Sequence, residues 1–210
     1  MTIVSRTADG SNTIYSERFG EHYHSKFSAA NETERVFIEA GYLAVNGVAV
    51  DVLEIGFGSG LNALYTLRQA VELRRHTRYE TIELFPIDEI TARDFLSDEL
   101  FLSLHTAPWE RHIEIVSEFV LYKRKVDLLE ATFSSKFDIV YFDAFSPQTQ
   151  PEMWSEDVFR KIFAAMKPGA VLTTYCAKGD VRRTMQRVGF TVEKLKGPPA
   201  GKREMLRGTK

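Results

Sequence analysis

The chain contains very little cysteine and no long hydrophobic run. Cys176 is the only cysteine in 210 residues, which excludes an intramolecular disulfide framework and a cysteine-cluster metal site, so a reducing cytoplasm is the expected compartment. No apolar run approaches the roughly 18 residues that cross a bilayer, and the N-terminus MTIVSRTADG lacks the apolar stretch of a signal peptide. We therefore expect neither export nor insertion into a membrane.

The charge is small overall but unevenly distributed. Residues 178–210 contain ten Lys and Arg against three acidic residues, a net +7, although the whole chain carries −2. Charge segregated in this way can mark a surface that binds a polyanion. A solvated basic helix and tail explains the charge alone at least as well.

The order of the predicted elements indicates the fold class. Apolar runs predict strands at 50–55, 79–84, 137–142, 170–176, 190–195 and 203–207. Helical periodicity predicts a helix from Leu61, with Leu64, Leu67 and Val71 on one face, and further helices at 156–166, ended by Lys167-Pro168-Gly169, and at 179–188. Strands that alternate with helices predict one doubly wound α/β domain, whose continuous apolar run 137–142 lies near the sheet centre.

Two regions are less regular. Residues 1–49 predict an N-terminal arm packed on a core of residues 50–210, with a short helix opened by the capping pattern Asn31-x-x-Glu34. Residues 88–133 stay ambiguous, because 112–116 alternates as a strand whereas 119–126 fits either a strand or a hairpin.

A glycine-rich turn provides the first candidate site. Glu54-Ile55-Gly56-Phe57-Gly58-Ser59-Gly60 lies between a predicted strand and a predicted helix, where glycines let a ligand approach the amides of a helix N-terminus. The spacing differs from the G-x-G-x-x-G that binds a dinucleotide pyrophosphate, and no P-loop lysine follows. We predict that Glu54, Gly56, Phe57, Gly58 and Gly60 bind a cofactor without phosphate, the alternative being a tight turn with no ligand.

Two acidic residues follow later strands. Glu83 ends the second predicted strand, 23 residues after Gly60, where a carboxylate can accept hydrogen bonds from both ribose hydroxyls. Asp143 follows the run 137–142 at the edge where open α/β sheets bind ligands, and Phe145 offers a packing wall beside it. The alternatives are a surface glutamate and a turn-forming aspartate. His22 and His24 lack a third ligand at convincing spacing, so we expect no metal.

These residues resemble a known family. Glu54 with its glycines, Glu83 and the strand FDIVYFDAF resemble the class I S-adenosylmethionine-dependent methyltransferases. Five ordered blocks across residues 10–208 look like the methyltransferase half of the bacterial MnmC-type tRNA 5-methylaminomethyl-2-thiouridine enzymes and its stand-alone relatives: YSERFGEHYHS, EIGFGSGLNAL, DAFSPQTQPEMW, TYCAKGDVRRTMQRVGF and GPPAGKREMLRG. The family's Asp-Gly-Phe is here Asp143-Ala144-Phe145.

The resemblance implies a fold, a reaction and partners. It implies a mostly parallel, seven-stranded Rossmann-like sheet, and methylation of the 5-aminomethyl group on the wobble uridine of certain tRNAs with S-adenosylmethionine as donor. Upstream wobble-uridine modification enzymes are implied as partners. Because the chain ends at Lys210, we expect no flavin-dependent oxidase half and no flavin.

The same resemblance assigns residues to the site. Gly56, Gly58 and Glu83 are carried over to the cofactor, Asp143 to the substrate amine, and Lys202-Arg203-Glu204-Met205 to the substrate side. Tyr15, Tyr23 and Phe145 are candidates to enclose a flipped uridine, as base-modifying enzymes commonly require. Arg182, Arg183 and Arg187, predicted on the outward face of helix 179–188, are candidates for tRNA contact, and Lys202 and Arg203 for contact closer to the pocket.

Three other functions remain alternatives. A class I methyltransferase of a small amine or a protein would share the cofactor half, but the basic C-terminal segment favours RNA. A nucleotide-dependent oxidoreductase is disfavoured by the glycine spacing, and a non-catalytic RNA-binding module would leave the cofactor residues idle.

Overall fold

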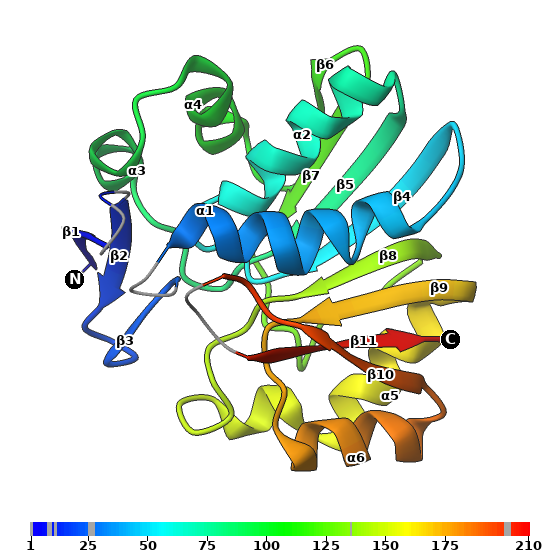
Figure 1. The fold of residues 1–210 in the computed structure, drawn as a ribbon. Helices are drawn as coiled ribbons and strands as arrows, with labels where there is room; N and C mark the ends of the chain where they lie inside the picture. The colour runs from blue at the N-terminus through cyan, green and yellow to red at the C-terminus, as the bar shows by residue number, and fades with distance from the viewer. Residues whose placement is uncertain (1, 8–9, 11, 25–27, 135, 200–202) are drawn as a thin grey trace.

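The computed structural model describes residues 2–7, 10, 12–24, 28–134, 136–199 and 203–210. Within them, eight strands form one sheet in the order β10-β11-β9-β8-β4-β5-β7-β6, and helices cover both of its faces (Figure 1). The strands are β4 (Ala49–Ile55), β5 (His76–Ile82), β6 (His112–Val116), β7 (Phe119–Arg124), β8 (Phe137–Phe142), β9 (Met166–Thr174), β10 (Thr191–Lys196) and β11 (Glu204–Thr209).

The sheet confirms the predicted α/β class. Strands β9, β8, β4, β5 and β7 run parallel, whereas β6, β11 and β10 pair antiparallel at the two edges. The run 137–142 is β8 and lies at the centre, as predicted. The resemblance implied seven strands; there are eight because the ambiguous segment supplies both β6 and β7, which form a hairpin.

Alternate residues of the central strands face two hydrophobic layers. Val50 and Val52 of β4 pack on one side with η1 (Thr33–Glu39), α2 (Leu61–Leu73) and α4 (Glu99–Thr106). Leu53 and Ile55 pack on the other side with α5 (Glu156–Ala165) and α6 (Gly179–Val188). This alternation follows from the two-residue period of a strand, and burial on both faces explains why these strands are continuously apolar.

Three local predictions were wrong. Val71 is 44% exposed, because the buried side of α2 uses Leu64, Leu67 and Ala70. Lys167-Pro168-Gly169 lies inside β9 rather than before it, where the pairing with β8 shifts register. The first N-terminal helix, α1 (Ala29–Glu32), is capped by Ser28 instead of Asn31, since the Ser28 hydroxyl accepts the Asn31 amide hydrogen.

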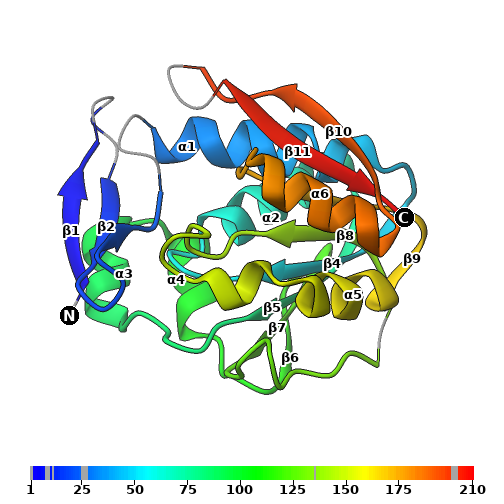
Figure 2. The same cartoon turned by 90° about the horizontal axis from the view of Figure 1, so that it is seen from below.

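The N-terminal segment adds a second, smaller sheet. Strands β1 (Thr2–Arg6), β2 (Asn12–Ser16) and β3 (Glu21–His22) are antiparallel and lie beside α3 (Glu89–Phe95), beyond the carboxyl ends of the parallel strands (Figure 2). The Asn12 amide donates a hydrogen bond to the Phe95 carbonyl at 2.8 Å. The short helices η2 (Tyr42–Ala44) and η3 (Pro151–Trp154) complete the described elements. The domain boundary at residues 49 and 50 stays a prediction.

In the described ranges, no helix is both long enough and apolar enough to span a membrane.

Candidate functional site

A cavity of about 970 Å³ opens where the carboxyl ends of β4, β5 and β8 meet the N-terminal sheet. Its floor contains the glycine turn after β4 and residues that follow the other two strands. Residues 15 and 18–24 line it as well, so two distant parts of the sequence enclose one space. This is the edge at which open α/β sheets bind ligands.

The glycine turn has a backbone that side chains would disrupt. Gly56 and Gly58 have φ of 91° and 51°, the left-handed region that favours glycine. A Cβ at Gly56 would lie 2.7 Å from the Asp143 carbonyl oxygen, and one at Gly58 would lie 2.9 Å from the Tyr23 ring. The glycines therefore let β4, β8 and the N-terminal segment converge on the cavity.

Glu83 bridges the turn and the segment after β5. Its Oε2 accepts the Gly58 amide hydrogen at 3.0 Å, and its Oε1 accepts the Phe85 amide hydrogen at 2.8 Å. Burial raises the pKa of Glu83, although the backbone amides of Phe85, Gly58 and Leu84 oppose the shift. A carboxylate offers about four acceptor sites, so Glu83 keeps acceptor capacity for a ligand hydroxyl beside these three amides.

Asp143 lies immediately after β8 and is held by backbone and side-chain contacts. Its amide donates to the Ile55 carbonyl at 3.0 Å, and its Oδ2 accepts a hydrogen bond from the Asn62 side-chain amide at 2.8 Å. The next residues are fixed as well, since the Tyr175 hydroxyl donates to the Ala144 carbonyl at 2.9 Å and the Trp154 indole to the Phe145 carbonyl at 2.8 Å. Asp143 thus borders the cavity on a loop that these hydrogen bonds hold in place.

Aromatic rings also line the cavity. Phe145 packs against Phe19 and Tyr23, with ring centroids 4.5 and 5.1 Å apart. Burial, and after it the negative charge of Glu83, raises the pKa of the Tyr23 hydroxyl, which keeps that group neutral. Tyr15 also lines the cavity. The three aromatic residues predicted from the sequence therefore all line the cavity, as does Phe19.

Two predicted cofactor residues do not line the cavity. Glu54 is fully buried beneath the turn, where its Oε2 accepts a hydrogen bond from the Thr81 hydroxyl at 2.8 Å. Burial raises the pKa of Glu54 well above its usual range, and the Asp143 charge adds to the shift. Gly60 is buried as the N-cap of α2, where a Cβ would lie 2.7 Å from His105 Nε2. Gly56, Phe57 and Gly58 do line the cavity.

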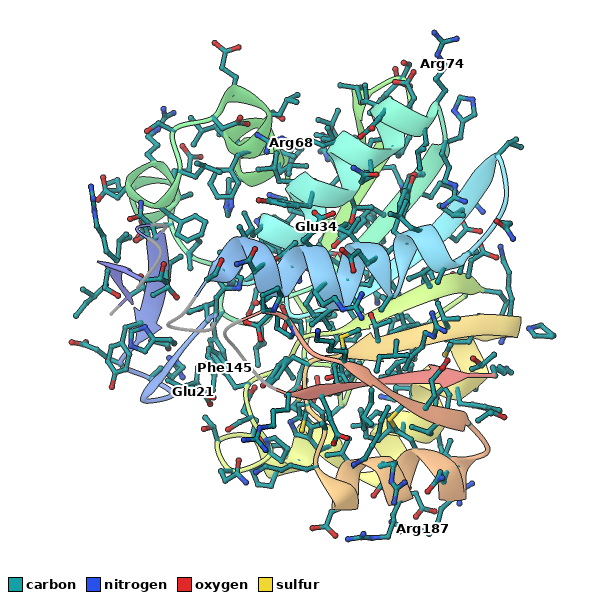
Figure 3. All side chains as sticks on the ribbon, in the orientation of Figure 1. Glu21, Glu34, Arg68, Arg74, Phe145 and Arg187 are labelled. Carbon is teal, nitrogen blue, oxygen red and sulfur yellow. The ribbon has the colours of Figure 1, made fainter. Side chains whose placement is uncertain are left out.

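The predicted basic residues lie apart from this space. None of the described residues of 178–210 is among the cavity-lining residues, and Figure 3 shows Arg187 far from Phe145 and Glu21. Arg183 pairs with Asp180 on the exposed face of α6. The prediction that Arg182 points outward was wrong: the side chain is half-buried, because it lies beside the buried residues of α6. Its Nε has no hydrogen-bond partner. Arg203 is exposed before β11, and Lys202 lies outside the described residues.

Sequence reasoning missed several residues of the site. Glu21 accepts hydrogen bonds from the Ser146 amide and hydroxyl at 3.3 and 3.0 Å, which joins β3 to the loop after β8. Arg18 stacks on the Phe85 ring at 4.1 Å. His24 contacts the Ser59 hydroxyl at 2.5 Å, and burial lowers its pKa to about 4. These contacts join the N-terminal segment to distant loops, so no local pattern could reveal them.

The cavity lining is rich in acidic groups. Within the described lining, Arg18 is the single Lys or Arg, whereas the carboxylates come from Glu21, Glu32, Glu83, Asp127, Asp143 and Glu152. Opposite charges attract most strongly where solvent is excluded. The cavity therefore suits ligands with positive charge.

The chain is similar to known proteins in sequence and in fold. Residues 109–210 match a family model described as S-adenosyl-L-methionine-dependent methyltransferase. The chain is 32% identical over 93% of its length to the tRNA 5-methylaminomethyl-2-thiouridine biosynthesis bifunctional protein MnmC of Nitrosospira multiformis, and 31% identical over 94% to that of Leptospira interrogans. It spans about a third of each of these relatives, 35% and 34%.

Solved structures show the same fold. MnmC2 from Aquifex aeolicus superimposes with a TM-score of 0.78 at 23% identity, over 99% of this chain and 70% of that one. Spermidine synthase from Thermotoga maritima gives 0.61 at 14% identity, over 99% of this chain and 72% of that one. Residues 109–210 are therefore similar to an S-adenosyl-L-methionine-dependent methyltransferase family, and the chain is similar to the MnmC proteins over most of its length.

Proposed function

We propose that the chain transfers a methyl group from S-adenosylmethionine to the 5-aminomethyl nitrogen of the wobble uridine, or 2-thiouridine, of tRNA. One observation carries the proposal. The glycine turn, Glu83 bound to that turn, and Asp143 held by Asn62 all border the same acidic cavity. The curated relatives of the chain are named for tRNA 5-methylaminomethyl-2-thiouridine biosynthesis.

The donor side fits an adenosine-containing sulfonium. Glu83 would accept hydrogen bonds from the ribose hydroxyls, and the open glycine backbone at Gly56 and Gly58 would admit the ligand close to the turn. The carboxylates of the lining favour the positive charge of the sulfonium. S-adenosylmethionine supplies an already activated methyl group and leaves as S-adenosylhomocysteine after transfer to an amine.

The acceptor side fits an amine attached to a flat base. Asp143 would hold and orient the amine, while Phe145, Tyr23 and Phe19 would pack against the flipped uridine. Because a carboxylate is a weak base near neutral pH, the amine proton passes to water before or during attack. The protein contributes mainly alignment, which suffices for a donor that is already activated. Such an acceptor requires an upstream enzyme that installs the aminomethyl group.

Parallel assays with different acceptors test the proposal. The purified chain is incubated with S-adenosylmethionine labelled in its methyl group and, separately, with tRNA bearing 5-aminomethyl-2-thiouridine, with the same tRNA lacking the aminomethyl group, with polyamines and with a protein mixture. We expect label only in the aminomethyl tRNA. Label in polyamines or protein but not in tRNA would instead support the small-amine or protein methyltransferase.

A further inference from the structure

Asn62 makes a hydrogen-bonded link between Asp143 and the N-terminal segment. Its side-chain amide donates to Asp143 Oδ2 at 2.8 Å, and its Oδ1 accepts a hydrogen bond from the Thr33 hydroxyl at 2.9 Å. Asn62 is only 3% exposed and Thr33 only 1%. The three groups form a chain that runs from η1 through the first turn of α2 to the end of β8.

The chemistry of the three groups fixes the direction of this link. An ionised carboxylate only accepts hydrogen bonds, so the Asn62 amide has to present its NH₂ group to Asp143 and its oxygen to Thr33. The Thr33 hydroxyl donates to that oxygen and so favours the same orientation. The backbone of Asn62 is also fixed, since its carbonyl accepts a hydrogen bond from the Thr66 hydroxyl at 2.8 Å.

Several titratable groups surround the Asp143 carboxylate. Glu54 is on β4, Tyr79 is on β5 and Tyr175 directly follows β9, and the charge of Asp143 raises the pKa of all three groups. Asn62 supplies a neutral donor within this acidic set and also reaches the cavity wall. A donor at that position can hold one carboxylate oxygen without neutralising the charge that attracts an amine.

We propose that Asn62 is a positioning residue that orients the Asp143 carboxylate toward the acceptor amine, with Thr33 holding Asn62 in place. The inference rests on the proposed function, because it assigns Asp143 to the amine. Through Thr33, the N-terminal segment would then help to position Asp143, in addition to lining the cavity with residues between 15 and 24. The π-helical turn of η1, which begins at Thr33, is a local geometry that is frequent at functional sites.

Isosteric variants test the link. Asn62→Leu removes the hydrogen bonds to Asp143 and Thr33 together with the interaction of Asn62 with Glu54, whereas Thr33→Val removes only the bond between Thr33 and Asn62. Asn12→Leu is a control that removes a side-chain amide bonded to a backbone carbonyl outside the cavity. We expect kcat for tRNA methylation to fall about tenfold or more in Asn62→Leu and by a smaller factor in Thr33→Val. The affinity for S-adenosylmethionine and the KM for tRNA should change little in either variant.

A measurement independent of turnover completes the test. The Asp143 carboxyl is followed by ¹³C NMR during a pH titration of aspartate-labelled protein, with Asp143→Asn used to assign its signal. Asn62→Leu should move its titration midpoint upward, because the charged form loses a donor. If Asn62→Leu does not fold, Thr33→Val carries both measurements, with the smaller shift expected.

The outcomes separate the two claims. Wild-type kcat and an unmoved midpoint in Asn62→Leu would overturn the positioning role, as would an equal loss of kcat in Asn12→Leu. Absence of tRNA methylation by the wild-type chain would instead refute the proposed function, and the NMR midpoint would then decide whether Asn62 holds the Asp143 carboxylate.

Discussion

The Glu83 carboxylate accepts the Gly58 amide hydrogen at 3.0 Å, which joins the end of β5 to the middle of the glycine turn after β4. The Phe85 amide holds the other carboxylate oxygen at 2.8 Å. The acidic group is therefore already oriented on the turn in the protein alone. Preorganisation of this kind lowers the cost of binding, because the group need not be ordered when the ligand arrives.

Replacing Glu83 should weaken donor binding. Glu83→Ala removes the acceptors that we assign to the ribose, and a hydrogen bond to a charged group contributes about 1.5–3 kcal/mol. Titration calorimetry with S-adenosylmethionine should show a Kd higher by about 10- to 100-fold. Glu80→Ala, which removes a glutamate paired with Arg124, is the control. Equal affinities in wild type and Glu83→Ala would remove Glu83 from the donor site.

Replacing Asp143 should separate binding from turnover. Asp143→Asn preserves shape but removes the negative charge that we assign to the acceptor amine. We expect kcat to fall by about 100-fold or more, a loss of roughly 3 kcal/mol of transition-state stabilisation, while calorimetry gives an almost unchanged Kd for S-adenosylmethionine. Full activity would refute this role, and lost donor binding would place Asp143 on the cofactor side.

Glu54 should make the protein less stable as the pH rises. Its folded-state pKa is raised by burial, so above the ordinary value of about 4.5 the unfolded chain releases a proton that the folded chain retains. Glu54→Gln cannot titrate at this position. The free energy of unfolding of the variant minus that of wild type should therefore increase by about 1.4 kcal/mol for each pH unit above 4.5, until the folded-state pKa is reached. Urea unfolding at pH 5 and pH 7 measures this difference. A difference that is the same at both values would show that Glu54 is ionised in the folded protein.

The basic face of α6 provides a test of tRNA contact. Replacing Arg182, Arg183 and Arg187 together by Gln should raise the Kd for tRNA and reduce its salt dependence, because each neutralised phosphate releases counterions. The affinity for S-adenosylmethionine should not change, since these side chains lie outside the cavity lining. Arg74→Gln is a control at the opposite end of the molecule (Figure 3). Wild-type tRNA affinity and salt slope in the triple variant would identify this face as an ordinary solvated surface.

Local patterns predicted the fold well and the site only in part. The run 137–142 and helix 179–188 appear with the predicted bounds, because apolar continuity and helical periodicity report burial directly. The same patterns cannot show which side chains meet across the chain. Glu54 was therefore assigned to the ligand although it points into the core, and Asn62, among apolar neighbours on α2, was missed although it contacts Asp143.

The N-terminal segment shows the same limit. Tyr23 was proposed from its residue type, but its contact with Gly58 depends on how residues 15–24 cross the edge of the sheet. Glu21 gave no signal in the sequence, since its bonds to Ser146 span 125 positions. Long-range contacts of this kind are set by tertiary packing and not by spacing.

The most direct test of the central claim is nucleoside mass spectrometry of the tRNA product. tRNA that carries 5-aminomethyl-2-thiouridine is treated with the wild-type chain and S-adenosylmethionine, then digested to nucleosides. We predict that the wobble nucleoside gains the mass of one methylene unit, with fragmentation placing the new methyl group on the aminomethyl nitrogen, and that Asp143→Asn leaves the nucleoside largely unmodified. An unmodified wobble nucleoside after treatment with wild-type protein that binds S-adenosylmethionine, or a methyl group placed on the base or ribose, would contradict the account.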